Sequence, residues 1–375
     1  MECSGLATPA PLIEVSGPPR ERGRQYGAQA AARIRLGIAH YSEQLGATGL
    51  DTAGIREIAL SFEPQIARFD ADMAEEMRGI AEGAGLHPAD ILLLNARTEI
   101  LKLAKRKKDP DPDGCTGVVA LPGITADGKL IHAQNWDWKL ECAETAVVLK
   151  IRRDDGPDVL TFTEAGGLAR SGMNAAGIVV TANYLESDRD YRSAGVPLAL
   201  IRRKALMAGQ LAVAMHAVYT TAKSASNNMI VSHAGGIAID FECAPDESFQ
   251  VHPDNGLLVH ANHWVSPVAL SKLRDTGILA TPDSLYRDLR VRDLLAPQRG
   301  SITVDAVKAA LFDDYQTPWS VCRPPRPNLS NNLSATVAQV VMVPADGVME
   351  VAMLPALDRR FTTYRLEPME LRSAA

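Results

Sequence analysis

The segment Asp109-Pro-Asp-Pro-Asp-Gly-Cys-Thr116 divides the chain into two parts of different character. Before it, apolar residues recur every three or four positions, as the buried face of a helix requires. After it, short apolar runs alternate with Asp-Gly and Pro-containing turns, which is typical of antiparallel strands. The Pro- and Asp-rich stretch itself predicts an exposed loop, with Gly114 and Cys115 at the point where the loop meets the first strand.

The part of the chain before residue 110 predicts three consecutive helices. Apolar residues with helical spacing cover residues 26–45 and again residues 55–80, and Gly83 and Gly85 mark the end of the second helix. The third helix begins at Pro88 and ends in the basic run Lys102–Lys108. Three helices cannot by themselves account for the longer remainder of the chain.

The part after residue 114 predicts many antiparallel strands with a few helices between them. Strands or strand pairs are expected at 117–121 with 130–134, 145–152 with 158–163, 177–181, 228–231, 237–241, 256–260, and 336–343 with 348–354. Helices are expected over 197–222, 282–296 and 301–313. Strands and helices segregated in this way favour an α+β fold built as a layered sandwich.

Composition excludes several classes of function. The 375 residues are 46% hydrophobic and 22% charged, as in ordinary globular proteins, and the net charge of -6 argues against a nucleic-acid surface. No apolar run is long enough to cross a membrane, and the N-terminal residues lack the pattern of a secretory signal. The five cysteines are scattered, odd in number and never in a CxxC pair, which predicts a reducing, cytoplasmic location.

Gly114 followed by Cys115 is the arrangement that a self-cleaving precursor needs. The thiol attacks the preceding carbonyl, an N-to-S shift gives a thioester, and water then releases a new N-terminal cysteine. Glycine at position 114 removes side-chain crowding at the peptide that is cut. The freed α-amine, with a reference pKa of about 7.7–8.0, can act as the base for its own thiol. The dipeptide alone is weak support, because most Gly-Cys pairs only occupy turns.

Several further motifs share one order along the chain, and together they resemble the peptidase C45 family of acyl-coenzyme A:6-aminopenicillanic acid acyltransferases (isopenicillin N acyltransferase). The resemblance is carried by Glu21–Gly27, Leu94–Glu99, Asp113-Gly-Cys-Thr116, Gln134-Asn-Trp-Asp137, Thr163-Glu-Ala-Gly166, Gly172–Gly177, Gly195-Val-Pro197, Ala261-Asn-His263 and Ser320-Val-Cys-Arg323. It covers nearly the whole chain.

The resemblance implies a fold, a maturation step and roles for particular residues. The fold is the four-layer αββα sandwich of N-terminal-nucleophile hydrolases, and self-cleavage gives an α chain, residues 1–114, that is released or retained, and a catalytic β chain, residues 115–375. Cys115 is similar to the nucleophile, Asp137 to the acid that orients its amine, and Asn262 to the amide of the oxyanion hole. Arg323 looks like an arginine that holds the nucleophile or a substrate carboxylate, and Ser226 like a serine near the nucleophile.

Each of these residues also has a structural interpretation. Asp137 can cap a turn at a strand end, Asn262 can bridge backbone groups in a sheet bend, and Ser226 can be a local hydrogen bonder. His263 suggests a Cys-His dyad, but the resemblance assigns the base to the α-amine and leaves His263 structural. The chain also departs from the family at Gly117, where the penicillin acyltransferases carry a hydroxyl residue, which weakens any claim to their particular substrates.

Two enzymatic functions and two other interpretations remain open. In an amidohydrolase, Cys115 takes the acyl group from a small N-acyl amide and water releases it. In an N-acyltransferase, the same acyl-enzyme passes its acyl group to an amine. We favour hydrolysis, because water is always available as the acceptor. The other interpretations are an uncleaved, non-catalytic binding protein and a conventional Cys-His protease.

The sequence predicts no cofactor. His260 and His263 lack the spacing of a metal site, and no phosphate-binding loop is present, so a coenzyme A thioester can only be a substrate. The expected partners are a small amide or thioester and the two chains of the cleaved protein, with a homo-oligomer possible. Neither a nucleic acid nor a membrane is expected.

Overall fold

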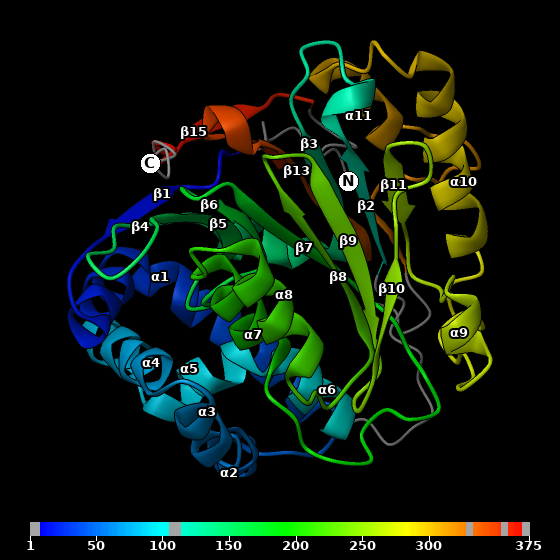
Figure 1. Ribbon diagram of the computed structural model, residues 1–375. Helices are drawn as coiled ribbons and strands as arrows, with labels where there is room; N and C mark the ends of the chain where they lie inside the picture. The colour runs from blue at the N-terminus through cyan, green and yellow to red at the C-terminus, as the bar shows by residue number, and fades with distance from the viewer. Residues whose placement is uncertain (1–7, 105–113, 328–332, 354–358, 370–375) are drawn as a thin grey trace.

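The protein consists of two β-sheets packed face to face, with helices covering both outer faces (Figure 1). The computed structural model describes residues 8–104, 114–327, 333–353 and 359–369. The loop expected at 109–113 therefore lies outside the described residues, while Gly114 and Cys115 lie within them.

The first sheet has eight strands in the order β1-β4-β5-β6-β7-β8-β9-β10. Its strands are β1 (Leu12–Val15), β4 (Ala146–Ile151), β5 (Val159–Glu164), β6 (Ser171–Asn174), β7 (Ile178–Tyr184), β8 (Asn227–His233), β9 (Ile237–Cys243) and β10 (Ser248–Val251). All neighbours are antiparallel except β1, which runs parallel to β4.

The second sheet has the order β11-β2-β3-β13-β14-β15, with β12 pairing to β13. Its strands are β2 (Gly114–Ala120), β3 (Ile131–Lys139), β11 (Leu257–His260), β12 (Arg326–Pro327), β13 (Leu333–Val343), β14 (Val348–Met353) and β15 (Thr362–Arg365). Every neighbouring pair in this sheet is antiparallel, and the hairpin of β2 and β3 is the one that the Asp-Gly turn predicts.

The helices form two outer layers. The first contains α1 (Pro19–Gly46), α2 (Thr52–Leu60), α3 (Glu63–Phe69), α4 (Ala71–Ala84), α5 (Pro88–Asn95), α6 (Arg97–Ala104), α7 (Leu198–Leu206) and α8 (Leu211–Thr220). There α7 contacts β6 and β7, and α8 contacts β8. On the other side α10 (Ser284–Leu295) contacts β2 and β11, and α11 (Val304–Leu311) contacts β3 and β13, while the short α9 (Pro267–Leu270) precedes them. Because β7 also contacts β2 and β3, the expected αββα sandwich is confirmed.

Three of the predicted helices are wrong as continuous elements. The pattern over 55–80 is divided among α2, α3 and α4, and α3 is separated from α4 because Asp70 has an extended backbone and caps α4 by accepting from the Met73 amide at 2.9 Å. The helix expected from Pro88 onward is broken at Ala96, and the one expected over 197–222 is broken near Gly209. The strands β1, β6, β10, β12 and β15 were not expected, since none exceeds four residues.

The segment before Cys115 is helical in the main but also completes the first sheet. Its strand β1 pairs with β4 over four residues. A buried ion pair joins the same two parts of the chain, because Glu76 of α4 accepts from Arg203 of α7 at 2.9 and 3.0 Å. The described part of residues 1–114 is thus integrated into the sandwich.

Helices α1 and α4 cross so closely that their contact has room only for glycine. A Cβ atom at Gly27 would overlap the carbonyl oxygen of Ile80, and one at Gly79 would overlap that of Arg20. These atoms belong to helix backbones, which cannot move aside as a flexible side chain can. Gly46, at the end of α1, has no such neighbour within 4 Å.

We predict that Gly27→Ala lowers the free energy of unfolding by about 1–3 kcal/mol or more, because the added methyl group forces α1 and α4 apart. The matched control Gly46→Ala should leave stability unchanged or raise it by up to about 1 kcal/mol, since alanine is the better helix former. Urea denaturation of both variants measures the difference. Equal effects of the two substitutions would contradict the close crossing.

Candidate functional site

Gly114 and Cys115 are the first two residues of β2, in the interior of the second sheet. The register with β3 places Gly114 opposite Asp137 and Cys115 opposite Trp136. Successive side chains of a strand point to opposite faces. Cys115 and Gly117 face the first sheet, where a Cβ atom at Gly117 would lie 2.8 Å from Ile230 of β8. The Cys115 thiol is therefore buried between the two sheets, with a relative exposure of 1%.

Gly114 faces the opposite side, against a buried pair of charges. A Cβ atom at this position would lie 2.5 Å from Arg323 Nη1 and 2.6 Å from Asp137 Oδ2. No side chain fits at such distances, so the close approach of Asp137 and Arg323 requires glycine before the cysteine. The sequence prediction that glycine avoids crowding at this peptide agrees with the geometry.

Asp137 and Arg323, both proposed from sequence, lie together beside Gly114. Arg323 Nε is 3.4 Å from Asp137 Oδ2, and Arg323 Nη2 is paired with Asp283. Asp137 Oδ1 accepts a hydrogen bond from Thr336 Oγ1 at 2.7 Å. Burial opposes ionisation of Asp283, but Arg287 and Arg323 outweigh it and hold the pKa of Asp283 below its ordinary value.

Asn262 contacts Cys115 directly, through its side-chain oxygen. Asn262 Oδ1 accepts from the Cys115 backbone nitrogen at 2.8 Å. Its Nδ2 donates to the Tyr184 carbonyl at 2.9 Å. The sequence associated Asn262 with donation to an oxyanion, whereas the contact in the uncut chain is acceptance from the nucleophile's own nitrogen.

Arg287 is a site residue that sequence reasoning missed. This side chain of α10 donates to the Cys115 carbonyl at 2.7 Å, to Thr116 Oγ1 at 2.8 Å and to Asn262 Oδ1 at 2.8 Å. Its Nε pairs with Asp283, one helical turn earlier, at 2.8 Å. The i, i+4 spacing of Asp283 and Arg287 was visible in the sequence, but nothing there separated it from an ordinary surface pair on a helix rich in arginine.

Arg170 is a second residue that the sequence did not single out. It directly precedes β6 in the first sheet, and its Nη2 lies 3.6 Å from Cys115 Sγ. Its guanidinium stacks 4.2 Å from the centre of the Trp136 ring. A cation at this distance favours the thiolate, which is the reactive form of cysteine.

Ser226 and His263 make their hydrogen bonds with other groups. Ser226 bonds Asp190 through its amide and hydroxyl, and Ser187 through its hydroxyl at 2.8 Å. Burial raises the pKa of Asp190 to about 6. His263 Nδ1 lies 2.8 Å from Ser284 Oγ, and burial together with the positive charge of His260 lowers its pKa. These partners agree with the structural interpretation of both residues.

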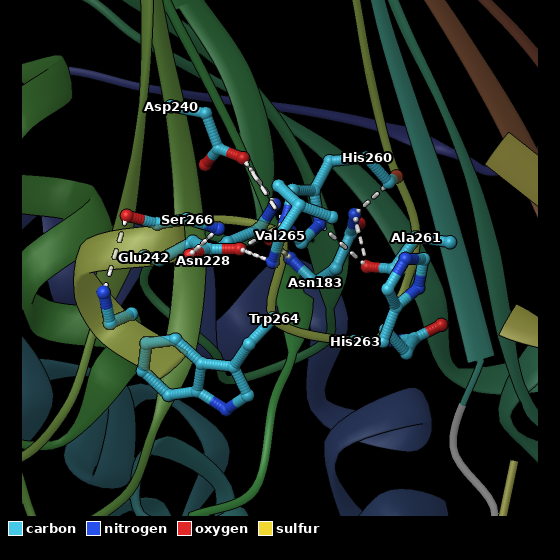
Figure 2. A network of polar contacts seen from close by, with 12 residues as sticks. Asn183, Asn228, Asp240, Glu242, His260, Ala261, His263, Trp264, Val265 and Ser266 are labelled. Carbon is cyan, nitrogen blue, oxygen red and sulfur yellow. Dashed lines mark hydrogen bonds and ion pairs between the residues drawn. The ribbon is translucent and has the colours of Figure 1, made fainter. Parts of the chain in front are cut away.

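The turn that carries Asn262 is fixed by buried polar groups of the first sheet (Figure 2). Glu242 of β9 accepts from the Val265 amide at 2.6 Å, from the Ser266 amide at 3.0 Å and from His260 Nε2 at 2.8 Å. Asn183 of β7 donates to the carbonyl groups of His260 and Ala261 at 2.9 and 3.1 Å. Neighbouring strands thus set the position of Asn262.

His260 is held as a cation within this network. Burial alone would lower the pKa of His260, but the carboxylates of Asp240 and Glu242 outweigh burial and raise it to about 9. The Asp240 carboxylate lies 3.6 Å from His260 Nε2. Burial raises the pKa of Asp240 itself to about 6, so at neutral pH a buried imidazolium lies beside buried carboxylates.

The fold and the site define an α+β sandwich with a buried cysteine at the start of a central strand, and comparison with known proteins gives the family. The model of the acyl-coenzyme A:6-aminopenicillanic acid acyl-transferase family matches residues 124–353. The chain belongs to this family. It is 28% identical over 313 residues to the 40 kDa form of acyl-coenzyme A:6-aminopenicillanic-acid-acyltransferase from Emericella nidulans, covering 83% of this chain and 84% of that protein.

Solved structures give more distant matches. The conjugated bile acid hydrolase from Clostridium perfringens matches with a TM-score of 0.49 and 13% identity, over 68% of this chain and 93% of its own. Penicillin V acylase from Agrobacterium tumefaciens matches with a TM-score of 0.45 and 16% identity, over 67% of this chain and 86% of its own. The Caenorhabditis elegans orthologue of N-acylethanolamine-hydrolyzing acid amidase matches with a TM-score of 0.43 and 17% identity, over 67% of this chain and 100% of its own.

The described residues offer neither a metal site nor a membrane-spanning helix. Among them, no group of three or more His, Cys, Asp or Glu side chains has the arrangement of a metal site. In the same residues, every helix is too short or too polar to cross a membrane.

We predict that His260 makes stability depend on pH. A basic group whose pKa is raised by folding stabilises the protein fully below its pKa in the unfolded chain, near 6.5, and this contribution is lost as the pH rises through about 9. The free energy of unfolding of the wild type should therefore fall between pH 7 and 9, relative to His260→Gln, by an amount on the order of 2 kcal/mol. The exposed control His252→Gln should follow the wild type. If the free energy of unfolding depends on pH in the same way for the wild type and for His260→Gln, the raised pKa of His260 is contradicted.

Proposed function

We propose that this protein cleaves itself between Gly114 and Cys115 and then uses Cys115 as an N-terminal nucleophile that hydrolyses a small N-acyl amide. The observation that carries the proposal is the hydrogen bond from the Cys115 nitrogen to Asn262 Oδ1, beside a glycine that the Asp137–Arg323 pair requires. The family match begins after Cys115, so this assignment rests on the geometry at the start of β2.

Self-cleavage would use the groups that lie at this point together with one water molecule. Cys115 Sγ attacks the Gly114 carbonyl carbon, the bond to the Cys115 nitrogen breaks, and that nitrogen takes up a proton to become an amine. Water then hydrolyses the Gly114 thioester, giving a carboxylate on Gly114 and a free thiol on Cys115. Asn262 Oδ1 accepts from the nitrogen before the bond breaks and can hold the amine afterwards. Arg323 lies next to the new carboxylate.

In turnover, the α-amine of Cys115 serves as the base for the thiol of the same residue. Asn262 holds the amine through Oδ1, and Arg287 holds Asn262 and the Cys115 carbonyl. The Asn262 NH2 group has two donors, and Tyr184 takes one of them. The second can stabilise a tetrahedral oxyanion, which is the role that the family resemblance suggests. Arg170 favours the thiolate form of Cys115. Asp137 pairs with Arg323 and so helps to hold this arginine beside the new N-terminus at Cys115.

The mature protein on this proposal is a heterodimer of residues 1–114 and 115–375. Its α chain stays bound after cleavage rather than leaving. The parallel pairing of β1 with β4 and the buried pair of Glu76 with Arg203 both join the two chains. Removing one partner of a buried ion pair costs several kcal/mol, so these contacts oppose dissociation.

Acyl transfer to an amine is the second candidate, and the name of the family and of the Emericella nidulans relative favours it. Both reactions pass through an acyl group on Cys115 and differ only in whether water or an amine removes it. A non-catalytic binding protein is the alternative of another class, and failure of Cys115 to form an acyl-enzyme would indicate it.

We predict that Cys115→Ala abolishes hydrolysis of a panel of N-acyl p-nitroanilides, because no acyl-enzyme can form. The matched control Cys243→Ala removes another buried thiol, on β9 of the first sheet, and should keep activity within about threefold of wild type. Release of p-nitroaniline measures both. Full activity of Cys115→Ala would refute the role of Cys115 as the nucleophile.

The same assay separates the two acceptors. With 6-aminopenicillanic acid or β-alanine added in millimolar amounts, a hydrolase should return the free acid as the main product, whereas a transferase should return the new amide. Mass spectrometry of the products gives the ratio directly. A predominance of new amide would replace hydrolysis by transfer and leave the role of Cys115 unchanged.

A further inference from the structure

A pocket lies on the side of β2 to which the Cys115 thiol points. Residues of α5, α6, β5 and α7 and the segment before β6 line it. Its charged lining residues are Arg97, Glu99, Glu164, Arg170 and Arg202, and Asn95 is among its polar ones. No residue of this pocket was among those proposed from sequence for the site.

Arg170 links the pocket to the nucleophile. It lines the pocket and also places Nη2 3.6 Å from Cys115 Sγ. A molecule bound in this pocket would therefore have its near end beside the thiol. The pocket is in the right place for one part of the substrate.

Arg202 of α7 is half-buried, and its Nε lies in the interior of the protein. In the part of the chain that the structure describes, nothing accepts a hydrogen bond from its buried Nε. Arg203, the next residue of α7, also has an unbonded Nε, but its Nη2 donates to both oxygens of Glu76, whereas no described carboxylate is hydrogen-bonded to Arg202. A buried guanidinium nitrogen without an acceptor is costly, and a water molecule or the acceptor group of a ligand can satisfy it.

The carboxylates of the pocket are already engaged. Glu164 accepts from Arg97 Nε at 2.7 Å and from the Tyr41 hydroxyl at 2.6 Å. Glu99 accepts from the Leu198 amide at 3.0 Å, and burial raises its pKa.

Among the described residues that line the pocket, three are arginines and two are glutamates. Burial lowers the pKa of Arg202 to about 9, and the positive charges of Arg170 and Arg97 add to the effect. An anion bound between these guanidinium groups would offset both the burial and the mutual repulsion.

We propose that this pocket is a carboxylate-binding subsite, in which Arg202 and Arg170 hold a carboxylate of the substrate while its amide carbonyl reaches Cys115. Guanidinium groups bind carboxylates through paired, charge-assisted hydrogen bonds, which give both affinity and orientation. The preferred substrate is thus an N-acyl amide that carries a carboxylate, on either its acyl or its amine part. This inference rests on the proposed role of Cys115 as nucleophile.

Alkylation of Cys115 tests the subsite without any turnover. Iodoacetate carries a carboxylate and iodoacetamide is its neutral counterpart, and peptide mass spectrometry reports the rate at Cys115 apart from the other cysteines. Relative to N-acetylcysteine, the wild type should favour iodoacetate over iodoacetamide by about tenfold. Arg202→Gln should abolish the preference, which is read as the ratio of the two rates because a change in the thiolate fraction of Cys115 alters both rates alike. The control Lys204→Gln, on the same helix but paired with Asp70, should keep it.

Several outcomes would overturn the subsite. One is that the ratio of the iodoacetate rate to the iodoacetamide rate is the same for Cys115 as for N-acetylcysteine. Another is that Arg202→Gln keeps the wild-type ratio, and a third is that iodoacetate does not label Cys115. If Arg202→Gln does not fold, the comparison of wild type with N-acetylcysteine still decides. Amide hydrolysis without selectivity for iodoacetate would refute the subsite alone, whereas selectivity in a protein without Cys115-dependent activity would refute the proposed function alone.

Two substrate pairs then assign the carboxylate to the acyl or the amine part. Glutaryl anilide is compared with butyryl anilide, and N-butyryl-4-aminobenzoate with the same butyryl anilide. Arg202→Gln should raise KM about tenfold for one carboxylate substrate and leave butyryl anilide unchanged. An equal rise for the neutral anilide would mean that Arg202 acts on structure and not on a carboxylate.

Discussion

The pairing of β2 with β3 is the constraint on which the rest of the site depends. It places Gly114 against Asp137 and Cys115 against Trp136. Neighbouring residues of a strand face opposite sides. Gly114 therefore meets the charged side chains beneath α10, and the thiol of Cys115 lies between the two sheets. A shift of one residue would exchange these environments, placing the thiol against Arg323 and the glycine against the first sheet.

Buried charge is the second organising feature, and it is distributed on both sides of this strand. Below Gly114, the carboxylates of Asp137 and Asp283 are matched by Arg323 and Arg287. Between the sheets, the His260 cation and Glu242 hold the turn that presents Asn262 to the Cys115 nitrogen. Such groups are costly to bury, and their pairing fixes one arrangement of backbone around the nucleophile. The pocket of Arg202 differs, because its described lining holds three guanidinium groups and only two carboxylates.

The sequence predicted the layers of the fold better than the limits of its elements. Helical spacing located the helices but missed the breaks at Asp70 and Ala96, because the apolar pattern continues through both and only the capping of α4 by Asp70 interrupts the first. Strands of two to four residues, such as β1 and β15, are too short to show alternation. Motifs singled out Cys115, Asp137, Asn262 and Arg323 because these residues stand in short, recognisable sequences, and in the structure they lie around the start of β2. Arg170, Arg202 and Arg287 could not be found in this way, because only packing of α7, α10 and β6 around β2 brings an ordinary arginine next to the nucleophile.

The mass of the purified wild-type protein tests the central claim, self-cleavage before Cys115, most directly. On this account, intact-mass spectrometry under denaturing conditions shows two chains, one ending at Gly114 and one beginning with Cys115. The two chains should elute together from a sizing column under native conditions, because β1 and Glu76 bind the α chain to the rest of the sandwich. A single uncut chain of 375 residues in a protein that hydrolyses amides would contradict the account, because Cys115 would then have no α-amine to act as its base.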